Sequence, residues 1–367
     1  MTDGYFIGLI SGTSMDAVDA ALINIRDGHP HLLQALSHTY PESIRETLLQ
    51  QLHQPEQIPF GEIIAIELQL ADCFAAAVDQ LLHESSADRQ LIKAIGSHGQ
   101  TLCHRPQAQP PYTIQLGDNA RLAVTTGIDV IGDFRRADLA DHGHAAPLAP
   151  LLHQQLLGSD DKRIGVLNIG GIANLTVLGE SRLLSGFDTG PGNALMDQWC
   201  RRHHQEAYDA DGRWAASGVV NTALLQGLRQ EPYFAAAPPK STGREAFNLH
   251  WLSQQAPALE SLPAADVQAT LLELTVTTIA DAVTQKSCDQ VYVCGGGVHN
   301  RRLMQRLSSA LNGIAVASTA SVGIDPDWVE ATLFGWLAWR HLNAIPSDLR
   351  PITGSRQQRV LGARWPA

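Results

Sequence analysis

Three glycine-rich turns, each placed directly after an apolar run of β type, constrain the fold of this 367-residue chain more than any other feature. They lie in the segments IGLISGTS (7–14), IGVLNIGGIAN (164–174) and VYVCGGGVHN (291–300). Glycine allows positive φ and lets backbone N–H groups come close to phosphate oxygens. The pattern therefore predicts an α/β protein that binds a nucleotide at these turns.

The first two of these segments look like copies of each other. Each leads through a short turn into a second apolar strand, at residues 17–25 and 172–178. One repetition at the scale of a domain indicates two similar α/β domains, and the chain is long enough for two cores. We expect domains at residues 1–145 and 146–367, with the last residues packing back on the first domain. Helical patterns span residues 41–51, 61–84, 145–157, 194–203 and 264–284.

Composition excludes several classes of protein. A formal net charge of −11 argues against non-specific nucleic-acid binding, which needs a basic surface. The sequence has neither an export signal nor an apolar run of about 18 residues, so we expect no membrane partner. The five cysteines are scattered and never form CxxC, which is typical of a reducing, cytoplasmic compartment.

Asp188 is the first candidate for a catalytic acid or base. It follows the apolar run 183–187 and precedes a turn with two glycines and a proline, so its carboxylate is expected to project from a strand end. Such a group acts as a general base when a water or hydroxyl lies within hydrogen-bond reach. The alternative is a structural cap of the 189–193 turn or of the helix that follows.

Asp16 and Asp19 follow the first glycine turn and are candidates for the neighbourhood of a metal ion. In nucleotide sites Mg²⁺ keeps several waters and takes only one or two carboxylates, so a single aspartate suffices. We favour Asp16 over Asp19. The alternative is a solvated strand face, because side chains 16, 18 and 20 alternate with 19 and 21.

Longer motifs bring a family into view. With SGTSMDAVD (11–19), GSHGQT (96–101), DFRRAD (133–138), NIGGIAN (168–174), GFDTGPGN (186–193), KSTGRE (240–245) and CGGGVHN (294–300), the sequence resembles the anhydro-N-acetylmuramic acid kinase family. The resemblance runs from about residue 5 nearly to the C-terminus. It implies the actin-like ATPase fold of sugar kinases, Hsp70 and actin, in which duplicated ribonuclease H-like domains enclose a nucleotide cleft.

The same resemblance implies an activity and its site. An enzyme of this family opens the ring of 1,6-anhydro-N-acetylmuramic acid with water and phosphorylates O6 from ATP, giving N-acetylmuramic acid 6-phosphate in peptidoglycan recycling. Asp188 would activate the water, Asp16 would neighbour Mg²⁺, directly or through water, and His98, Arg136 and Glu330 would contact the sugar. The ATP site would comprise Ser11, Gly12, Thr13, Ser14, Met15, Asp16, Ala17, Val18, Gly170, Gly171, Asn174, Gly295, Gly296 and Gly297.

Two positions depart from the pattern of the relatives. Superfamily kinases often carry an acid where this chain has Ile10, so the metal role would fall to Asp16 or be shared with Asp188. Many family members have glycine where this chain has Ala17. If that position needed positive φ, alanine would be strained by about 1 kcal/mol.

Two other functions fit the same fold. In an ordinary sugar kinase, Asp188 would deprotonate the substrate hydroxyl rather than water. An actin-like or Hsp70-like ATPase would act on a protein partner, although the chain shows no peptide-binding module or charged tail. The family resemblance also suggests a homodimer.

Overall fold

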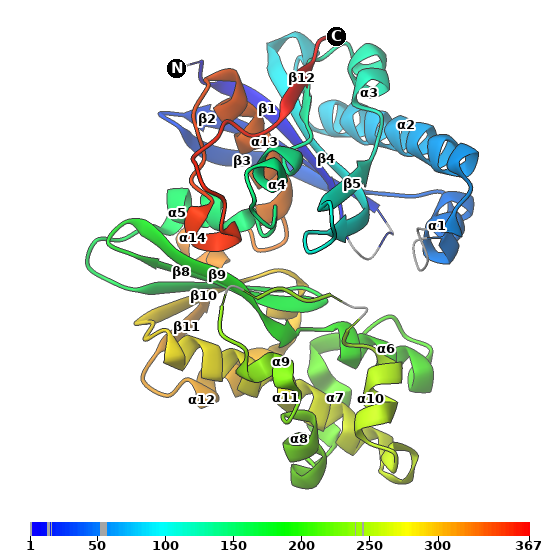
Figure 1. Ribbon diagram of the computed structural model, residues 1–367, viewed down its shortest axis with the longest axis vertical. Helices are drawn as coiled ribbons and strands as arrows, with labels where there is room; N and C mark the ends of the chain where they lie inside the picture. The colour runs from blue at the N-terminus through cyan, green and yellow to red at the C-terminus, as the bar shows by residue number, and fades with distance from the viewer. Residues whose placement is uncertain (1, 13–14, 16, 52–56, 239, 244–245) are drawn as a thin grey trace. The chain divides into compact units, whose positions relative to one another are not determined.

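The computed structural model describes residues 2–12, 15, 17–51, 57–238, 240–243 and 246–367 (Figure 1). The chain divides into two compact units, Met1–Leu152 with Trp328–Ala367, and His153–Asp327. The first unit thus extends beyond the expected boundary at residue 145. It also contains residues 328–367, because their helix packs on its sheet and their last strand pairs there.

A mixed sheet forms the centre of the first unit. Its strands are β1 (Gly4–Ser11), β2 (Ala17–Arg26), β3 (His29–Thr39), β4 (Ile92–Arg105), β5 (Tyr112–Leu116), β6 (Val130–Gly132) and β12 (Ala363–Trp365). They follow the order β12-β6-β4-β1-β2-β3, and β5 pairs with β4. β1 is antiparallel to β2 and parallel to β4, β2 is antiparallel to β3, and β4 is parallel to β6.

The long helix α2 (Phe60–Ser85) covers one face of this sheet. Its apolar residues recur at helical spacing, and Leu70 and Phe74 are buried in one cluster with Ile7 and Leu9 of β1. Burying such a stripe is what holds an amphipathic helix on a sheet. Further helices of the unit are α1 (Glu42–Gln51), α3 (Asn119–Thr126), α4 (Arg136–Ala140), α5 (Ala149–Leu157), which crosses into the second unit, and α14 (Arg350–Thr353).

Helix α13 (Val329–Leu342) lies on the opposite face. Successive side chains of a strand point to opposite faces, so Gly8 of β1 faces away from α2. A Cβ atom added to Gly8 would lie 1.8 Å from the Ala331 carbonyl oxygen, and one added to Gly96 of β4 would lie 1.9 Å from that of Phe334. These two glycines let the helix backbone rest on the sheet backbone.

The second unit repeats this topology. Its strands are β7 (Ile164–Ile169), β8 (Ile172–Gly179), β9 (Arg182–Pro191), β10 (Gln290–Cys294) and β11 (Ala315–Ser318), in the order β11-β10-β7-β8-β9. β7 is antiparallel to β8, β8 to β9, and β7 and β11 are each parallel to β10. This is the pattern of β6-β4-β1-β2-β3, so the predicted duplication is confirmed.

Helix α11 (Ala264–Gln285) is the central helix of the second unit. It buries Leu271, Leu274 and Ile279 in the same apolar cluster as Trp199 and other residues from strands and helices of the unit. In the described part of the chain, no helix is both long and apolar enough to cross a membrane. Further helices are α6 (Ala194–His204), α7 (Arg213–Ser217), α8 (Thr222–Leu228), α9 (Pro232–Ala235), α10 (Leu249–Gln255) and α12 (Arg301–Ala310).

Candidate active site

The first glycine turn joins β1 to β2. Ser11 is buried, and its Oγ lies 2.5 Å from Gln100 Oε1 and 3.1 Å from the Ala17 carbonyl oxygen, so this hydroxyl braces the turn. The Met15 N–H donates to the Gly12 carbonyl oxygen at 3.2 Å. The side chain of Val18 is buried in the apolar core, and its backbone is part of β2, opposite His38 of β3.

Three of the predicted residues of this turn, Thr13, Ser14 and Asp16, lie outside the described residues. Asp19 accepts a hydrogen bond from the Ser37 hydroxyl of β3 at 2.8 Å. In the described part of the turn, the positive φ falls on Met15 (55°), and Ala17 begins β2 without one. Alanine at position 17 therefore carries no such backbone strain.

The second glycine turn is bound to the corner between β9 and α6. The Gly171 carbonyl oxygen accepts from the N–H groups of Gly192 at 2.9 Å and Ala194 at 3.0 Å, and the Gly170 carbonyl oxygen accepts from Asn193 at 2.8 Å. A Cβ atom on Gly192 would lie 2.4 Å from the Gly170 carbonyl oxygen, so glycine is required there by packing. A Cβ on Gly170, in contrast, would make only ordinary contact at 3.7 Å.

The third glycine turn lies beside the second, because the parallel strands β7 and β10 end at the same edge of the sheet. Gly295 has φ 78° and a Cβ atom there would lie 2.2 Å from Asn168 Oδ1. Gly296 faces open space, with no atom within 4 Å of an added Cβ. Ligands of α/β proteins bind at the carboxyl ends of parallel strands. Gly296 therefore offers backbone that a phosphate or nucleoside could approach, whereas the Gly170 N–H already donates to the Ile172 carbonyl oxygen at 3.2 Å.

Asp188 lies on β9 directly opposite Asn174 of β8, and both side chains are half-buried. The next aligned pair is Gly190 with Ala173, so Thr189 is an extra residue in β9 and forms a β-bulge. Bulges re-aim side chains and are frequent beside active sites. The side chain of Asp188, the candidate base on β9, thus lies next to Asn174, the asparagine of the second glycine motif on β8.

A loop and a helix from far along the chain hold Asp188. The Thr242 N–H donates to Asp188 Oδ2 at 2.9 Å, and the Asp188 N–H donates to the Lys240 carbonyl oxygen at 3.2 Å. The Tyr233 hydroxyl donates to the Asp188 carbonyl oxygen at 2.9 Å. Asp188 thus contacts a loop outside the 189–193 turn, and the helix that follows has Asn193 as its N-cap residue.

Lys240 and Tyr233, which both contact Asp188, also contact each other. Lys240 Nζ donates to the carbonyl oxygens of Tyr233 at 3.0 Å and Phe234 at 3.2 Å, and it lies 4.7 Å from the centre of the Tyr233 ring. Burial lowers the pKa of Lys240, while the charge of Asp188 opposes the shift. Burial, and then Asp188, raise the pKa of Tyr233 above its usual value, so the hydroxyl remains a donor.

In the first unit, His98 and Arg136, two of the residues expected to contact the sugar, line one polar pocket. Arg136 is exposed, with Nε 3.6 Å from Asp133 Oδ1. Burial and the charge of Asp118 raise the pKa of Glu67 in this pocket, and Arg136 opposes the shift. The polar side chains around the pocket are Glu67, His98, Gln115, Asp118, Asn119, Asp133 and Arg136.

Arg135, which the sequence reasoning missed, is fixed between two elements. Its Nε donates to His98 Nε2 at 2.9 Å and its Nη1 donates to the Ala145 carbonyl oxygen at 2.6 Å. His98 Nδ1 in turn donates to the Gly99 carbonyl oxygen at 2.9 Å. Burial, and then the charge of Arg135, lower the pKa of His98 well below its usual range, so the ring is neutral.

Glu330 lies in the first turn of α13 and is exposed. Its charged neighbours are Arg135 and Asp19. The structure thus groups Glu330 with Arg135 rather than with the pocket of Arg136. Nothing in the local sequence distinguishes Arg135 from Arg136, since the two adjacent residues differ only in what the fold places around them.

No group of three His, Cys, Asp or Glu side chains among the described residues is arranged to hold a metal ion. All five cysteines are buried thiols and free of disulfides.

Comparison with known proteins matches residues 4–367 to the family model of anhydro-N-acetylmuramic acid kinase. An anhydro-N-acetylmuramic acid kinase of Xanthomonas oryzae pv. oryzae (strain MAFF 311018) is 47% identical over 367 residues, covering 99% of this chain and 97% of that one. One of Shewanella amazonensis is 46% identical over 369 residues, covering all of both chains.

Among solved structures, an activator of 2-hydroxyisocaproyl-CoA dehydratase from Clostridium difficile, with bound ADPNP, has a TM-score of 0.50 at 11% identity. The match covers 92% of this chain and 96% of that one, and it carries the fold alone. The predicted actin-like ATPase fold is confirmed. The chain belongs to the anhydro-N-acetylmuramic acid kinase family and is a phosphotransferase with an alcohol group as acceptor.

Proposed function

We propose that this chain uses ATP to phosphorylate O6 of 1,6-anhydro-N-acetylmuramic acid while water opens the anhydro ring. The products would be N-acetylmuramic acid 6-phosphate and ADP, a step of peptidoglycan recycling. The observation that carries the proposal is the fixed position of Asp188, held on both its backbone and its carboxylate beside the second glycine turn. The free thiols fit a cytoplasmic site for this reaction.

Asp188 would serve as the general base. Its carboxylate takes one proton from a water, the water oxygen bonds to C1, and the C1–O6 bond breaks. O6 then bonds to the γ-phosphorus of ATP as the bond to ADP breaks, so phosphorus receives the leaving oxygen in place of a proton. Inverting glycoside hydrolysis normally needs both a base and an acid. Phosphoryl transfer would replace the acid, and one carboxylate would suffice.

The nucleotide would bind along the glycine turns. Gly296 has the open backbone that a phosphate or nucleoside needs, whereas Gly192 and Gly295 are glycines for packing reasons. Asn174 lies beside Asp188, where its amide could contact the phosphate chain. We place Mg²⁺ at Asp16, directly or through water, where it would neutralise the charge of the transferred phosphoryl group.

The sugar would lie against the first unit. Arg136 would present its guanidinium fork to a carboxylate or to hydroxyls, and Glu330 would accept hydrogen bonds from hydroxyls. We expected His98 to contact the sugar as well. Since both of its ring nitrogens are engaged within the protein, we propose instead that His98 serves the site by holding Arg135.

The test is incubation with ATP, Mg²⁺ and 1,6-anhydro-N-acetylmuramic acid in ¹⁸O-water, followed by mass spectrometry of the product. We expect a 6-phosphorylated sugar with one ¹⁸O atom at C1. A phosphorylated sugar with an intact ring would favour the ordinary sugar kinase. ATP hydrolysis that is independent of any sugar would favour a protein-directed ATPase.

The matched variant is Asp188→Asn, which keeps the size of the side chain and its acceptor for the Thr242 N–H. We expect ATP binding to remain and turnover to be lost. Near-normal turnover in this variant would remove Asp188 as the base. Light scattering of the wild type would test the homodimer that the family resemblance suggests.

A further inference from the structure

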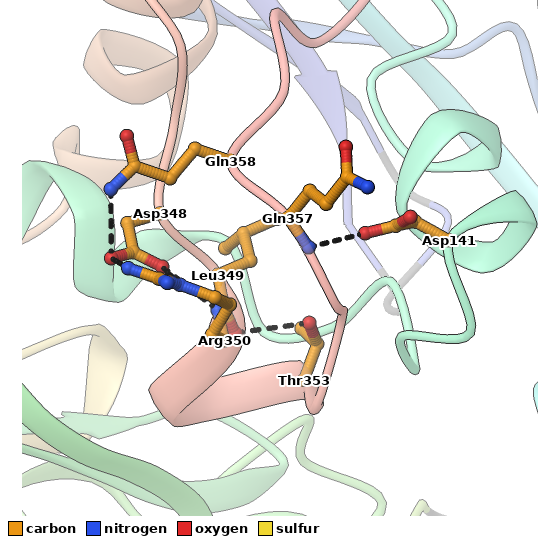
Figure 2. A network of polar contacts seen from close by, with 7 residues as sticks. All are labelled: Asp141, Asp348, Leu349, Arg350, Thr353, Gln357 and Gln358. Atoms are coloured by element: carbon orange, nitrogen blue, oxygen red, sulfur yellow. Dashed lines mark hydrogen bonds and ion pairs between the residues drawn. The ribbon is translucent and has the colours of Figure 1, made fainter.

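Two segments of the first unit, far apart in sequence, are tied together by buried carboxylates. We call residues 133–145 the arginine loop, because it contains Arg135, and residues 347–359 the strap. The strap closes on itself through the paired backbones of Ser347 and Arg359, whose N–H···O bonds measure 2.7 and 3.1 Å. Figure 2 shows the strap and its contact with Asp141 of the arginine loop.

Asp141 is the first link between the loop and the strap. Its Oδ2 accepts from the Gln357 N–H at 2.6 Å (Figure 2). The same oxygen accepts from the Arg356 N–H at 2.8 Å, and Oδ1 accepts from Arg359 Nη2 at 2.7 Å. These donors lower the pKa of Asp141, with the Arg359 hydrogen bond as the largest cause. The carboxylate therefore fixes the C-terminal half of the strap against the end of α4.

Asp138 is the second link, and it is 2% exposed. Its Oδ1 accepts from the Thr353 hydroxyl of the strap at 2.9 Å, and its Oδ2 accepts from the Ala145 N–H at 2.7 Å. The His144 N–H donates to the Thr353 carbonyl oxygen at 2.9 Å. We call these contacts of Asp138, Thr353 and Ala145 the latch.

The latch ends at Arg135. Ala145 connects the latch to Arg135. Its N–H donates to Asp138, and its carbonyl oxygen accepts from Arg135 Nη1. On its other side Arg135 Nε donates to His98, whose ring packs on Phe334 of α13 at 4.6 Å between centroids. The guanidinium is therefore positioned by the strap from one side and by the sheet and α13 from the other.

A guanidinium has five N–H donors. Two of those of Arg135 are used by His98 and Ala145, and among the described residues the other three have no hydrogen-bonded acceptor. The side chain is half-buried, and burial lowers its pKa only to about 10, against the opposing charges of Glu330 and Asp138. It is therefore charged at neutral pH, and the carboxylate of Glu330 is one of its charged neighbours.

We propose that Arg135 binds an oxyanion of the substrates, and that the latch of Asp138 and Thr353 is the positioning device for this contact. Arg135 would be the binding residue, and Asp138 and Thr353 positioning residues that act through it. The oxyanion is either the carboxylate of the sugar or a phosphate of ATP. This inference rests on the proposed function for the identity of those two substrates.

Kinetics of Arg135→Lys test the oxyanion contact. Lysine keeps the charge and loses the planar fork that binds an oxyanion through two N–H groups. We expect the KM of one substrate to rise about tenfold or more, corresponding to about 1.4 kcal/mol per factor of ten. A rise for the sugar identifies its carboxylate, and a rise for ATP identifies a phosphate. Wild-type KM values for both substrates would overturn the proposal.

Thr353→Val and Thr353→Ser test the latch. Valine removes the hydroxyl at nearly constant shape, whereas serine keeps it. We expect Thr353→Val to raise the same KM as Arg135→Lys by about threefold to tenfold, with kcat little changed, and Thr353→Ser to restore it. Asp348→Asn is the matched control, because it removes an ion pair with Arg350 elsewhere in the strap. An equal effect in that control would assign the KM change to general loosening of the strap.

Hydrogen exchange gives a readout that does not depend on activity. In Thr353→Val the amides of residues 139–146 should exchange faster than in the wild type, and in Thr353→Ser they should not. Unchanged exchange in the valine variant would overturn the latch. If the wild-type protein neither binds nor converts the anhydrosugar, the proposed function fails, while the exchange result and the affinity of Arg135→Lys for ATP, measured by direct binding, still decide this inference.

Discussion

Replacing Gly8 by alanine should destabilise the first unit more than most single substitutions do. The added Cβ would lie 1.8 Å from the Ala331 carbonyl oxygen and 2.6 Å from the Gly335 nitrogen, both of them backbone atoms of α13. Non-bonded heavy atoms need about 3.5 Å, so helix and sheet would have to separate by roughly 1.5 Å. That shift would open the packing along the whole helix. Overpacking typically costs 1–3 kcal/mol, and we expect about 3 kcal/mol or more here.

The structure sets an order for a series of alanine variants. Gly96→Ala should cost about as much as Gly8→Ala, because its Cβ would lie 1.9 Å from a backbone oxygen. Gly335→Ala should cost less, since its closest contact, 2.9 Å, is the movable Cδ1 of Ile23 and alanine favours the helix by up to about 1 kcal/mol. Gly61→Ala is the control, because no atom lies within 4 Å of its added Cβ.

Urea unfolding followed by far-ultraviolet circular dichroism measures the free energy of unfolding of each variant. We expect the order Gly61, Gly335, then Gly8 and Gly96, from the smallest loss of stability to the largest. If Gly8→Ala stays within about 0.5 kcal/mol of the wild type, the close approach of α13 to the sheet is refuted. Nucleotide binding of the folded variants separates this packing role from a direct role of Gly8 in the phosphate turn.

Further predictions concern the second unit. Tyr233→Phe removes the hydrogen bond to the Asp188 backbone and should lower kcat about threefold to tenfold with little change in KM, whereas an unchanged kcat and kcat–pH profile would show that the hydroxyl has no positioning role. Arg306→Gln should cost about 2 kcal/mol in urea unfolding, because Glu273 is 9% exposed and accepts two hydrogen bonds from this arginine; a cost below about 0.5 kcal/mol would make that ion pair dispensable. Burial lowers the pKa of His153 to about 3, so below about pH 6.5 the unfolded chain binds a proton that the folded chain does not. Stability should therefore fall by up to about 1.4 kcal/mol per pH unit from pH 6.5 downward through this residue, and a His153→Asn variant with the same slope as the wild type would contradict that.

Much of the fold could be predicted because its signals are local. An apolar run followed by glycines predicts a strand and a turn, and the same pattern at residues 7 and 164 predicted the duplicated hairpins of β1 with β2 and of β7 with β8. The long helices followed from their apolar spacing, and α2 and α11 lie close to the predicted ranges. Asp188 could be singled out because strand, aspartate and glycine turn are adjacent in sequence.

The sequence could not show which glycines of the motifs serve packing and which are open to a ligand. Gly8 and Gly96 belong to segments that were interpreted as ligand motifs, yet each meets the backbone of α13 more than two hundred residues later in the chain. Gly295 and Gly296 are adjacent, yet one is packed against Asn168 and the other is open. The local sequence is the same in both cases, because the atoms that surround each glycine come from residues far away along the chain.

The sequence by itself determined the class of fold and the family, and it singled out Asp188 as the candidate base, because each depends on residues that are close neighbours along the chain. Only the tertiary structure decided what holds those residues in place. Thr242 and Tyr233 reach Asp188 from 54 and 45 residues away, and Thr353 reaches Asp138 from 215. A polar group that is buried loses its hydrogen bonds to water and needs a partner within the protein. That partner is a residue that the fold brings close, however far away it lies along the chain.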